Sequence, residues 1–226
     1  ESYGSYRIEA LNVPSQARVS CLTSTYRLKP DDNSTVEYAY AIPVRDPLFG
    51  KAFGLYNSMD PLNQGRITLN YVSVFNPGTE PLNATLTVFS QDGNIDKVVP
   101  LDIAAGGRID TEVGSDRGFV TGLYEVNAPA GKPYGAFIAR YSPRPGGSGF
   151  NFAFAALASG GFCNQTIPVS TMGYATNWVE LANPNGQEVG TTVQIRLRDG
   201  TVVDQRYLSL PSRTQSAVGA NDAIDP

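Results

Sequence analysis

The chain has 226 residues, of which 41% are hydrophobic and 17% are charged, and its formal net charge is −4. This apolar content supports a folded core, and the length fits one large β domain or two of about 100 residues each. The acidic balance, with no cluster of Lys and Arg, excludes a nucleic-acid partner. No apolar run reaches the roughly 18 residues that a membrane-spanning helix needs, so we expect no membrane span.

Short runs of alternating apolar and polar residues, separated by Gly, Pro, Asn and Asp, predict an all-β protein. The expected strands in chain order are 6–11, 18–26, 36–44, 66–75, 84–89, 97–101, 108–113, 119–126, 134–141, 150–157, 176–182, 192–197 and 202–208. Pro77 lacks a backbone N–H and Gly78 tolerates positive φ, so they end the strand 66–75 in a turn. The pair Asp92-Gly93 predicts a tight type I′ hairpin.

An internal repeat relates two parts of the chain. The segment from Asn70 to Pro77 returns as Asn177 to Pro184, 107 residues later. In the same register Asp92-Gly93 matches 199–200, and Thr85 matches 192. A fixed internal offset of this kind indicates a duplicated structural unit.

A second, gapped match relates the start of the chain to its middle. Residues 4–10 resemble 122–128, and 38–41 resemble 152–155. We therefore expect one continuous unit over 66–160. A second unit is expected to be split into two halves, 1–45 and 168–226, with connectors at 46–65 and 161–167.

Seven short strands in about 100 residues is the count of an immunoglobulin-like sandwich. The expected fold is therefore two immunoglobulin-like antiparallel β-sandwich units, one continuous and one split between the chain termini. With its Asn76-Pro77 turn and Asp92-Gly93 hairpin, about half of the chain resembles duplicated bacterial cell-surface immunoglobulin-like β-sandwich proteins. The Cys, Trp, Cys spacing of true immunoglobulin domains is absent, and the resemblance assigns no functional residue.

Several features point to a secreted or cell-surface protein. The chain begins with Glu1 rather than Met, which is expected if a signal peptide has been removed. Cys21 and Cys163 form either one disulfide, in an oxidising compartment, or two separate thiols. If the protein is secreted, its candidate N-glycosylation sites, each of which opens an Asn-x-Ser/Thr sequence, are Asn33, Asn83 and Asn164.

The sequence offers no set of residues for catalysis. It contains no histidine, which removes the Ser-His-Asp and Cys-His arrangements and nearly all zinc sites. The 92–96 segment begins like a calcium loop, but Lys97 and Ile103 occupy the positions of the required Gly and Glu. We expect no enzymatic activity, no metal and no cofactor. Tyr38 and Tyr40 share one strand face, where packing is favoured over a sugar-binding platform.

Half of a β-sandwich exposes strand edges and an apolar face, which proteins normally cover. The two ends of the chain either meet within one molecule, or the C-terminal half of one copy is completed by the N-terminal half of the next. The segment expected to be exchanged is 1–11, with Tyr6, Ile8 and Ala10 on one face. The expected function is a structural or adhesive subunit that assembles with copies of itself into an extracellular filament, sheath or surface layer. The alternative is an extracellular module of a larger surface protein that binds carbohydrate or another protein.

Overall fold

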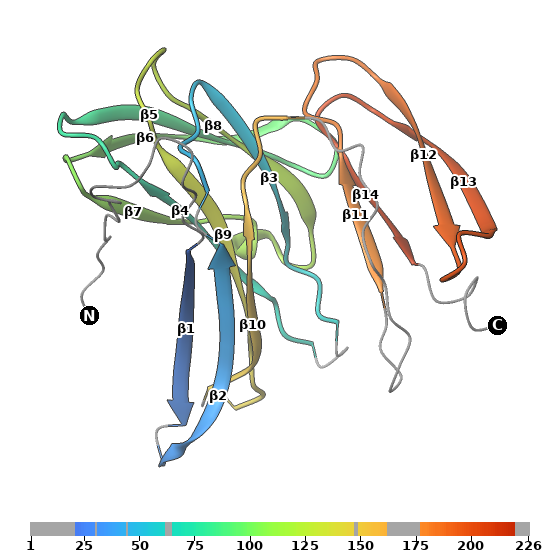
Figure 1. The fold of residues 1–226 in the computed structure, drawn as a ribbon, viewed down its shortest axis with the longest axis horizontal. Coiled ribbons are helices and arrows are strands. Elements are labelled where there is room, and N and C mark those ends of the chain that lie inside the picture. The colour runs from blue at the N-terminus through green and yellow to red at the C-terminus, as the bar shows by residue number, and fades with distance from the viewer. Residues whose placement is uncertain are drawn as a thin grey trace, which may run out of the picture.

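The structure, a computed structural model, describes residues 21–29, 31–43, 45–61, 65–146, 149–161 and 177–219. These residues are all-β, as predicted, and form antiparallel sheets (Figure 1). Within these ranges the helical structure is the short 3-10 turn η1 Ser115–Arg117, and no helix is long and apolar enough to cross a bilayer.

The middle of the chain is a sandwich of two four-stranded sheets. One sheet has the order β10-β9-β4-β7 and the other β3-β8-β5-β6. The strands are β3 Lys51–Asn57, β4 Leu69–Phe75, β5 Leu82–Phe89, β6 Ile95–Ile103, β7 Arg108–Glu112, β8 Thr121–Asn127, β9 Gly135–Pro143 and β10 Phe150–Leu157.

Alternating residues of both sheets fill the space between them. Val72 and Val74 of β4 face Leu86 and Val88 of β5, and all four are at most 1% exposed. Removing each such side chain from water contributes about 1.5–3 kcal/mol to folding. The sandwich thus has a continuous dry core that does not depend on either end of the chain.

Strand β3 lies inside 46–65, which the sequence suggested to be a connector. It pairs along its whole length with β8, from Lys51 opposite Asn127 to Asn57 opposite Thr121. Gly54 interrupts the alternation of apolar and polar residues by which the other strands were predicted, so this strand was not recognised from the sequence. The glycine is needed because a Cβ there would lie 2.3 Å from atoms of the Tyr124 ring.

The immunoglobulin-like detail of the prediction is not confirmed. Constant-type immunoglobulin domains have a four-stranded ABED sheet and a three-stranded CFG sheet. Both sheets of this sandwich have four strands, and β3 supplies the eighth. Two pairs of consecutive strands form hairpins within this sandwich, β5 with β6 and β9 with β10.

The turn at Asp92-Gly93 is present, but it is not type I′. The Gly93 N–H donates to the Ser90 carbonyl, the Ser90 N–H donates to Asn94, and Gly93 has φ of 78°. Type I′ requires positive φ at both central residues, and Asp92 does not have it. The loop is a type I turn closed by a left-handed glycine, with Gly93 and Asn94 both bonded to Ser90 as in a G1 bulge, and the ladder has a separate register shift between Val88 and Phe89.

The two ends of the described chain lie on different sides of the sandwich (Figure 1). The N-terminal hairpin of β1 Leu22–Lys29 and β2 Asp32–Pro43 packs along β10. At the other end β11 pairs with β14 and β12 with β13, and this C-terminal half lies against β3 and β8. Its strands are β11 Trp178–Ala182, β12 Val189–Arg196, β13 Val202–Leu210 and β14 Gln215–Gly219.

Candidate assembly surface

A buried asparagine closes the same turn in both copies of the repeat. The Asn76 side-chain amide donates to the carbonyls of Glu80 (2.7 Å), Ile103 (3.2 Å) and Ala104 (3.1 Å), and its Oδ1 accepts from the Gly78 N–H (2.9 Å). Asn183 makes the same four bonds at positions 107 residues later, with partners Gln187, Leu210, Pro211 and Asn185. Both asparagines are 2% exposed. The repeat is therefore present in the hydrogen bonds as well as in the sequence.

The strand pairing repeats with the same offset. Tyr71 lies opposite Glu112 in the β4–β7 ladder, and Trp178 lies opposite Gly219 in the β11–β14 ladder. Leu82 lies opposite Ile103 in β5–β6, and 189 lies opposite 210 in β12–β13. The C-terminal half thus carries the counterparts of β4, β5, β6 and β7.

Among the described residues, the C-terminal half lacks counterparts of the strands that complete the sandwich. In the sandwich, β9 pairs with the second edge of β4, and β8 pairs with the second edge of β5. In the described part of the chain no strand pairs with the corresponding edges of β11 and β12. Unpaired edges of this kind are sites where another strand can add.

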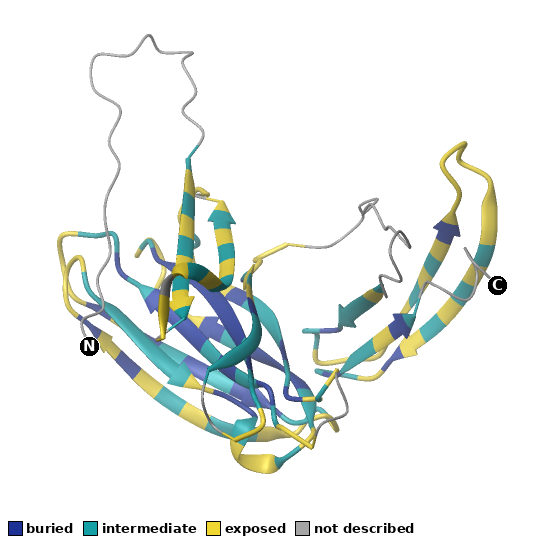
Figure 2. Ribbon diagram, turned by 90° about the horizontal axis from the view of Figure 1, so that it is seen from below, coloured by how far each residue is buried: buried dark blue, intermediate teal, exposed yellow. Residues whose placement is uncertain are grey.

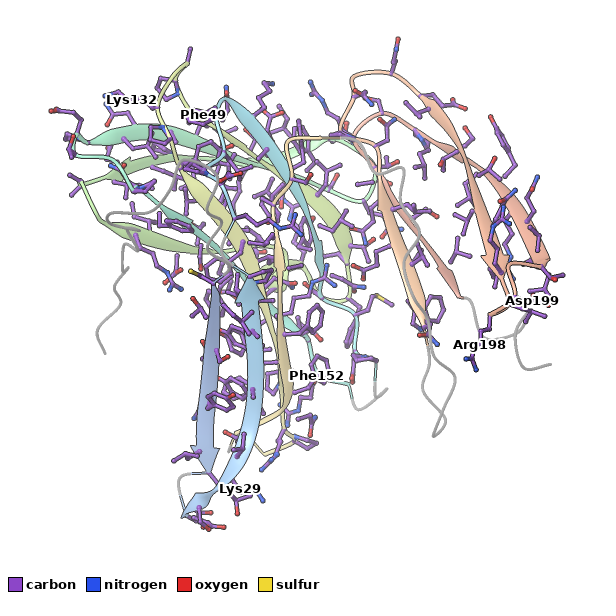
Figure 3. All side chains as sticks on the ribbon, in the orientation of Figure 1. Lys29, Phe49, Lys132, Phe152, Arg198 and Asp199 are labelled. Carbon is purple, nitrogen blue, oxygen red and sulfur yellow. The ribbon has the colours of Figure 1, made fainter. Side chains whose placement is uncertain are left out.

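The missing strands leave the inner face of the C-terminal half partly exposed. Val179, Leu181 and Val193 are only half-buried, although their counterparts Val72, Val74 and Leu86 are at most 1% exposed. Figure 2 shows the difference as dark blue strands in the sandwich and mainly yellow and teal strands in the C-terminal half. The far end of this half is the β12–β13 hairpin, with Arg198 and Asp199 at its tip, away from the sandwich (Figure 3).

The C-terminal half is attached to the sandwich by a buried ion pair. Arg140 of β9 donates two hydrogen bonds to the Glu180 carboxylate (3.1 and 2.9 Å), and the Asn57 amide donates a third (2.7 Å). Burial alone would raise the pKa of Glu180, but the hydrogen bonds and charge of Arg140, together with Asn57, hold that pKa below its ordinary value. A second contact places the Arg213 guanidinium 5.0 Å from the centre of the Phe89 ring.

The N-terminal hairpin is attached on the other side by aromatic side chains. Tyr38 and Tyr40 stack with their ring centres 6.3 Å apart, and both rings meet the ring of Tyr141 edge-on. Phe150 packs edge-on against Tyr38 at 5.7 Å. Burial, together with the hydrogen bond and charge of Tyr40, raises the pKa of the Tyr141 hydroxyl. These tyrosines therefore pack against protein in this structure.

Acidic and basic side chains strengthen the same contact. The Glu37 carboxylate accepts a hydrogen bond from the Phe150 N–H (3.0 Å) and forms an ion pair with Arg27 (3.0 Å). Arg27 also lies 4.8 Å from the centre of the Phe150 ring. The hairpin is held by this cluster rather than by a ladder, since β2 and β10 form separate sheets.

The residues singled out in the sequence are only partly within the described ranges. Cys21 is a free, half-buried thiol, and Cys163 lies outside the described residues, so their pairing stays a prediction. Asn83 is exposed on β5, and the backbone of Asn33 belongs to β2. The remaining residues named from the sequence, Asn164, Tyr6, Ile8 and Ala10, lie outside the described ranges.

Two exposed aromatic residues, one on each end of the described chain, were not anticipated from the sequence. Trp178 on β11 is 68% exposed and Tyr26 on β1 is 65% exposed. The repeat contained the signal for Trp178, because its counterpart Tyr71 packs against Tyr141 with ring centres 6.1 Å apart. In the described residues no group of three or more His, Cys, Asp or Glu side chains is arranged to hold a metal.

Comparison with known proteins does not place the chain in a family. No protein-family model matches it, and no curated protein matches it. Among solved structures, the crystal structure of Thermotoga maritima 1070 aligns with 49% of this chain and 93% of that chain, at 10% identity and a TM-score of 0.38. A likeness at this level carries no argument about fold or function.

Proposed function

We propose that this protein is a secreted structural or adhesive subunit that assembles with copies of itself into an extracellular filament, sheath or surface layer. The observation that carries the proposal is the C-terminal half of a sandwich, whose apolar inner face is partly exposed and two of whose strand edges pair with no strand in the described chain. A complete sandwich beside it shows which strands such a half requires.

The physical reason is the free energy of the uncovered face. Burial of apolar area contributes roughly 25 cal/mol per Å², so covering what is still exposed of Val179, Leu181 and Val193 contributes at most about 4 kcal/mol. Backbone groups on the open edges add directional hydrogen bonds to any strand that docks there. The chain would provide a strand at one end and an open strand edge at the other, so the contact between copies is heterologous. Heterologous contacts form chains or rings.

The test is the form of the full chain in solution. We expect light scattering at increasing concentration to show growth beyond the dimer, and negative-stain microscopy to show filaments or sheets of uniform width. A chain that stays monomeric at every concentration would show that the proposal is wrong.

A second candidate is an extracellular module that binds carbohydrate or a protein. Exposed aromatic side chains favour it, since Tyr207 on β13 is 74% exposed and Trp178 is 68% exposed. A glycan array distinguishes the two functions. Selective binding by the monomer that is lost in Tyr207→Ala supports the module, and no binding by an assembling protein supports the subunit.

A further inference from the structure

We infer that the open edge of β11 is occupied by β1 of a second copy of this chain, in one register that the intact sandwich specifies. This inference rests on the proposed function and deepens it, because it names the donor hairpin, the pairing of residues and the side chains that meet.

The N-terminal hairpin is the counterpart of the hairpin that completes the sandwich. Tyr38 to Ala41 on β2 correspond to 152–155 on β10, and Tyr26 on β1 corresponds to Tyr141 on β9. The two hairpins also pair alike, since Tyr26 lies opposite Ala39 and Tyr141 lies opposite Ala153. One chain therefore contains both parts of a second sandwich, the β9–β10 type of hairpin at its start and the β4–β7 set of strands at its end.

The register follows from the β4–β9 ladder. In it, Val74 lies opposite Ala136. The counterpart of Val74 is Leu181, and the counterpart of Ala136 is Cys21. The same transfer places Val179 opposite Thr23 of the second copy. Val74 and Ala136 are 1% and 2% exposed, so this pair faces the dry core.

The geometry of that pair is suited to a disulfide. The Ala136 carbonyl accepts a hydrogen bond from the Ala158 N–H, on the side of β10, so its polar groups point away from β4. Val74 and Ala136 are therefore a non-hydrogen-bonded pair, the type in which facing Cα atoms approach to about 4.5 Å. A disulfide requires Cα atoms about 4.4–6.8 Å apart.

The exposed aromatic residues meet in the same arrangement. Tyr71 and Tyr141 are in edge-on contact in the sandwich. Their counterparts are Trp178 of one copy and Tyr26 of the next, which are both largely exposed in the single chain. The proposed contact covers both at once.

A second copy is the favoured donor because the β1–β2 hairpin and the C-terminal half of one chain already pack against its own sandwich. The β1–β2 hairpin packs along β10, whereas β11 lies against β3, on a different side of the sandwich (Figure 1). Completion within one molecule would require the aromatic cluster of Tyr38 and Tyr40, or the Arg140–Glu180 pair, to separate. Completion by a neighbour leaves both contacts in place.

The test is disulfide trapping with the native Cys21. Leu181→Cys is made in a Cys163→Ser background, so that each copy carries one cysteine on β11 and one, Cys21, directly before β1. Under mild oxidation we expect a ladder of covalent multimers on a non-reducing gel, which a reductant abolishes. Ala182→Cys in the same background is the matched control, because its side chain faces the opposite side of the sheet, and we expect less than a tenth of the cross-linking.

A second pair of cysteines keeps the test valid if Leu181→Cys prevents the protein from folding. Val179→Cys with Thr23→Cys, in a chain that lacks both native cysteines, tests the same register two residues away, and a ladder is expected there too. A disulfide-bonded monomer would show completion within one molecule and overturn the inference. Assembly without cross-linking of either pair, or with equal cross-linking of the control, would overturn the register while leaving the proposed function standing. Absence of any assembly by the native chain would overturn both.

Trp178 gives an independent measure, since it is the single tryptophan of the chain. We expect its emission to shift to shorter wavelength as the protein concentration rises through assembly. Tyr26→Ala should weaken association about tenfold, the effect of losing one aromatic contact of about 1.4 kcal/mol. Tyr207→Ala removes an equally exposed tyrosine outside the proposed contact and should change association less than twofold; equal effects of the two substitutions would contradict the inference.

Discussion

The paired asparagines Asn76 and Asn183 allow one side chain to be tested in a complete and in an incomplete sandwich. In Asn76→Ala, three backbone carbonyls lose a donor and the Gly78 N–H loses its acceptor. The amide has two hydrogens, so the loss amounts to about three hydrogen bonds at about 1 kcal/mol each, or about 3 kcal/mol. In a domain of about 100 residues this lowers the melting temperature by roughly 12–24 °C.

Two signals separate the two parts of the molecule. Near-ultraviolet circular dichroism of the buried tyrosines Tyr56, Tyr124 and Tyr134 reports the sandwich, and Trp178 fluorescence reports the C-terminal half. We expect Asn76→Ala to shift the tyrosine transition and Asn183→Ala to shift the tryptophan transition, with the tyrosine transition unchanged. Asn76→Asp keeps the acceptor for Gly78 but places a carboxylate against three carbonyls, so it should cost at least as much as alanine.

A cost of less than about 1 kcal/mol for Asn76→Ala in urea denaturation would contradict this prediction, since the hydrogen bonds would then be replaced by water without loss. An equal lowering of the tyrosine transition by Asn183→Ala and by Asn76→Ala would also contradict it. That outcome would mean that the C-terminal half and the sandwich unfold as one unit.

Three further predictions concern the two ends of the chain and strand β3. Deletion of residues 1–11 should abolish assembly in light scattering, and an unchanged oligomer would exclude that segment as an exchanged strand. Glu180→Gln should release the C-terminal half at a cost of about 3 kcal/mol, because it leaves the buried Arg140 charge without its partner. Since folding lowers the Glu180 pKa, the native contact is present above the ordinary carboxyl value of 4.5 and is lost as pH falls through the lowered folded-state value; limited proteolysis should show this acid sensitivity in the native chain and not in the variant. Gly54→Ala should destabilise the sandwich by about 1–3 kcal/mol by overpacking against Tyr124, whereas Gly186→Ala, with no atom within 4 Å of the added Cβ, should be neutral in the same thermal melt.

The sequence predicted those features that depend on local residue patterns. Most strands of the sandwich alternate clearly, and the Asn76-Pro77 turn and the loop at Gly93 depend on residues whose backbone preferences are strong. Strand β3 was missed because Gly54 serves a contact with Tyr124, and that contact exists only after the chain folds. The type of the loop at Asp92 was missed because it depends on the hydrogen bonds of Ser90 with Gly93 and Asn94, which form only when the two strands pair.

The exposed surface was not predictable from local pattern. Val72 and Val74 have the same alternation as Val179 and Leu181, yet the first two are buried and the second two are half-buried. The difference comes from the strand that lies beside them, which the pattern of a single strand does not contain. Only the comparison of the two copies shows that the strands beside β4 and β5 have no counterpart beside β11 and β12 in the described residues.

The length of the sandwich has a consequence for the assembly. The unit runs from Lys51 at the start of β3 to Leu157 at the end of β10, a span of 107 residues that equals the offset of the repeat. Completion by a neighbour would therefore give two sandwiches of similar size per chain, one continuous and one composite. A heterologous contact repeated in this way produces a helical array whose exact repeat is one chain and whose approximate repeat is one sandwich. We expect electron micrographs of the filament to show a strong periodicity at the spacing of one sandwich and a weaker one at twice that spacing. A filament with only the longer periodicity would mean that the junction between copies differs from the junction within a copy, and that the C-terminal half is covered in another way.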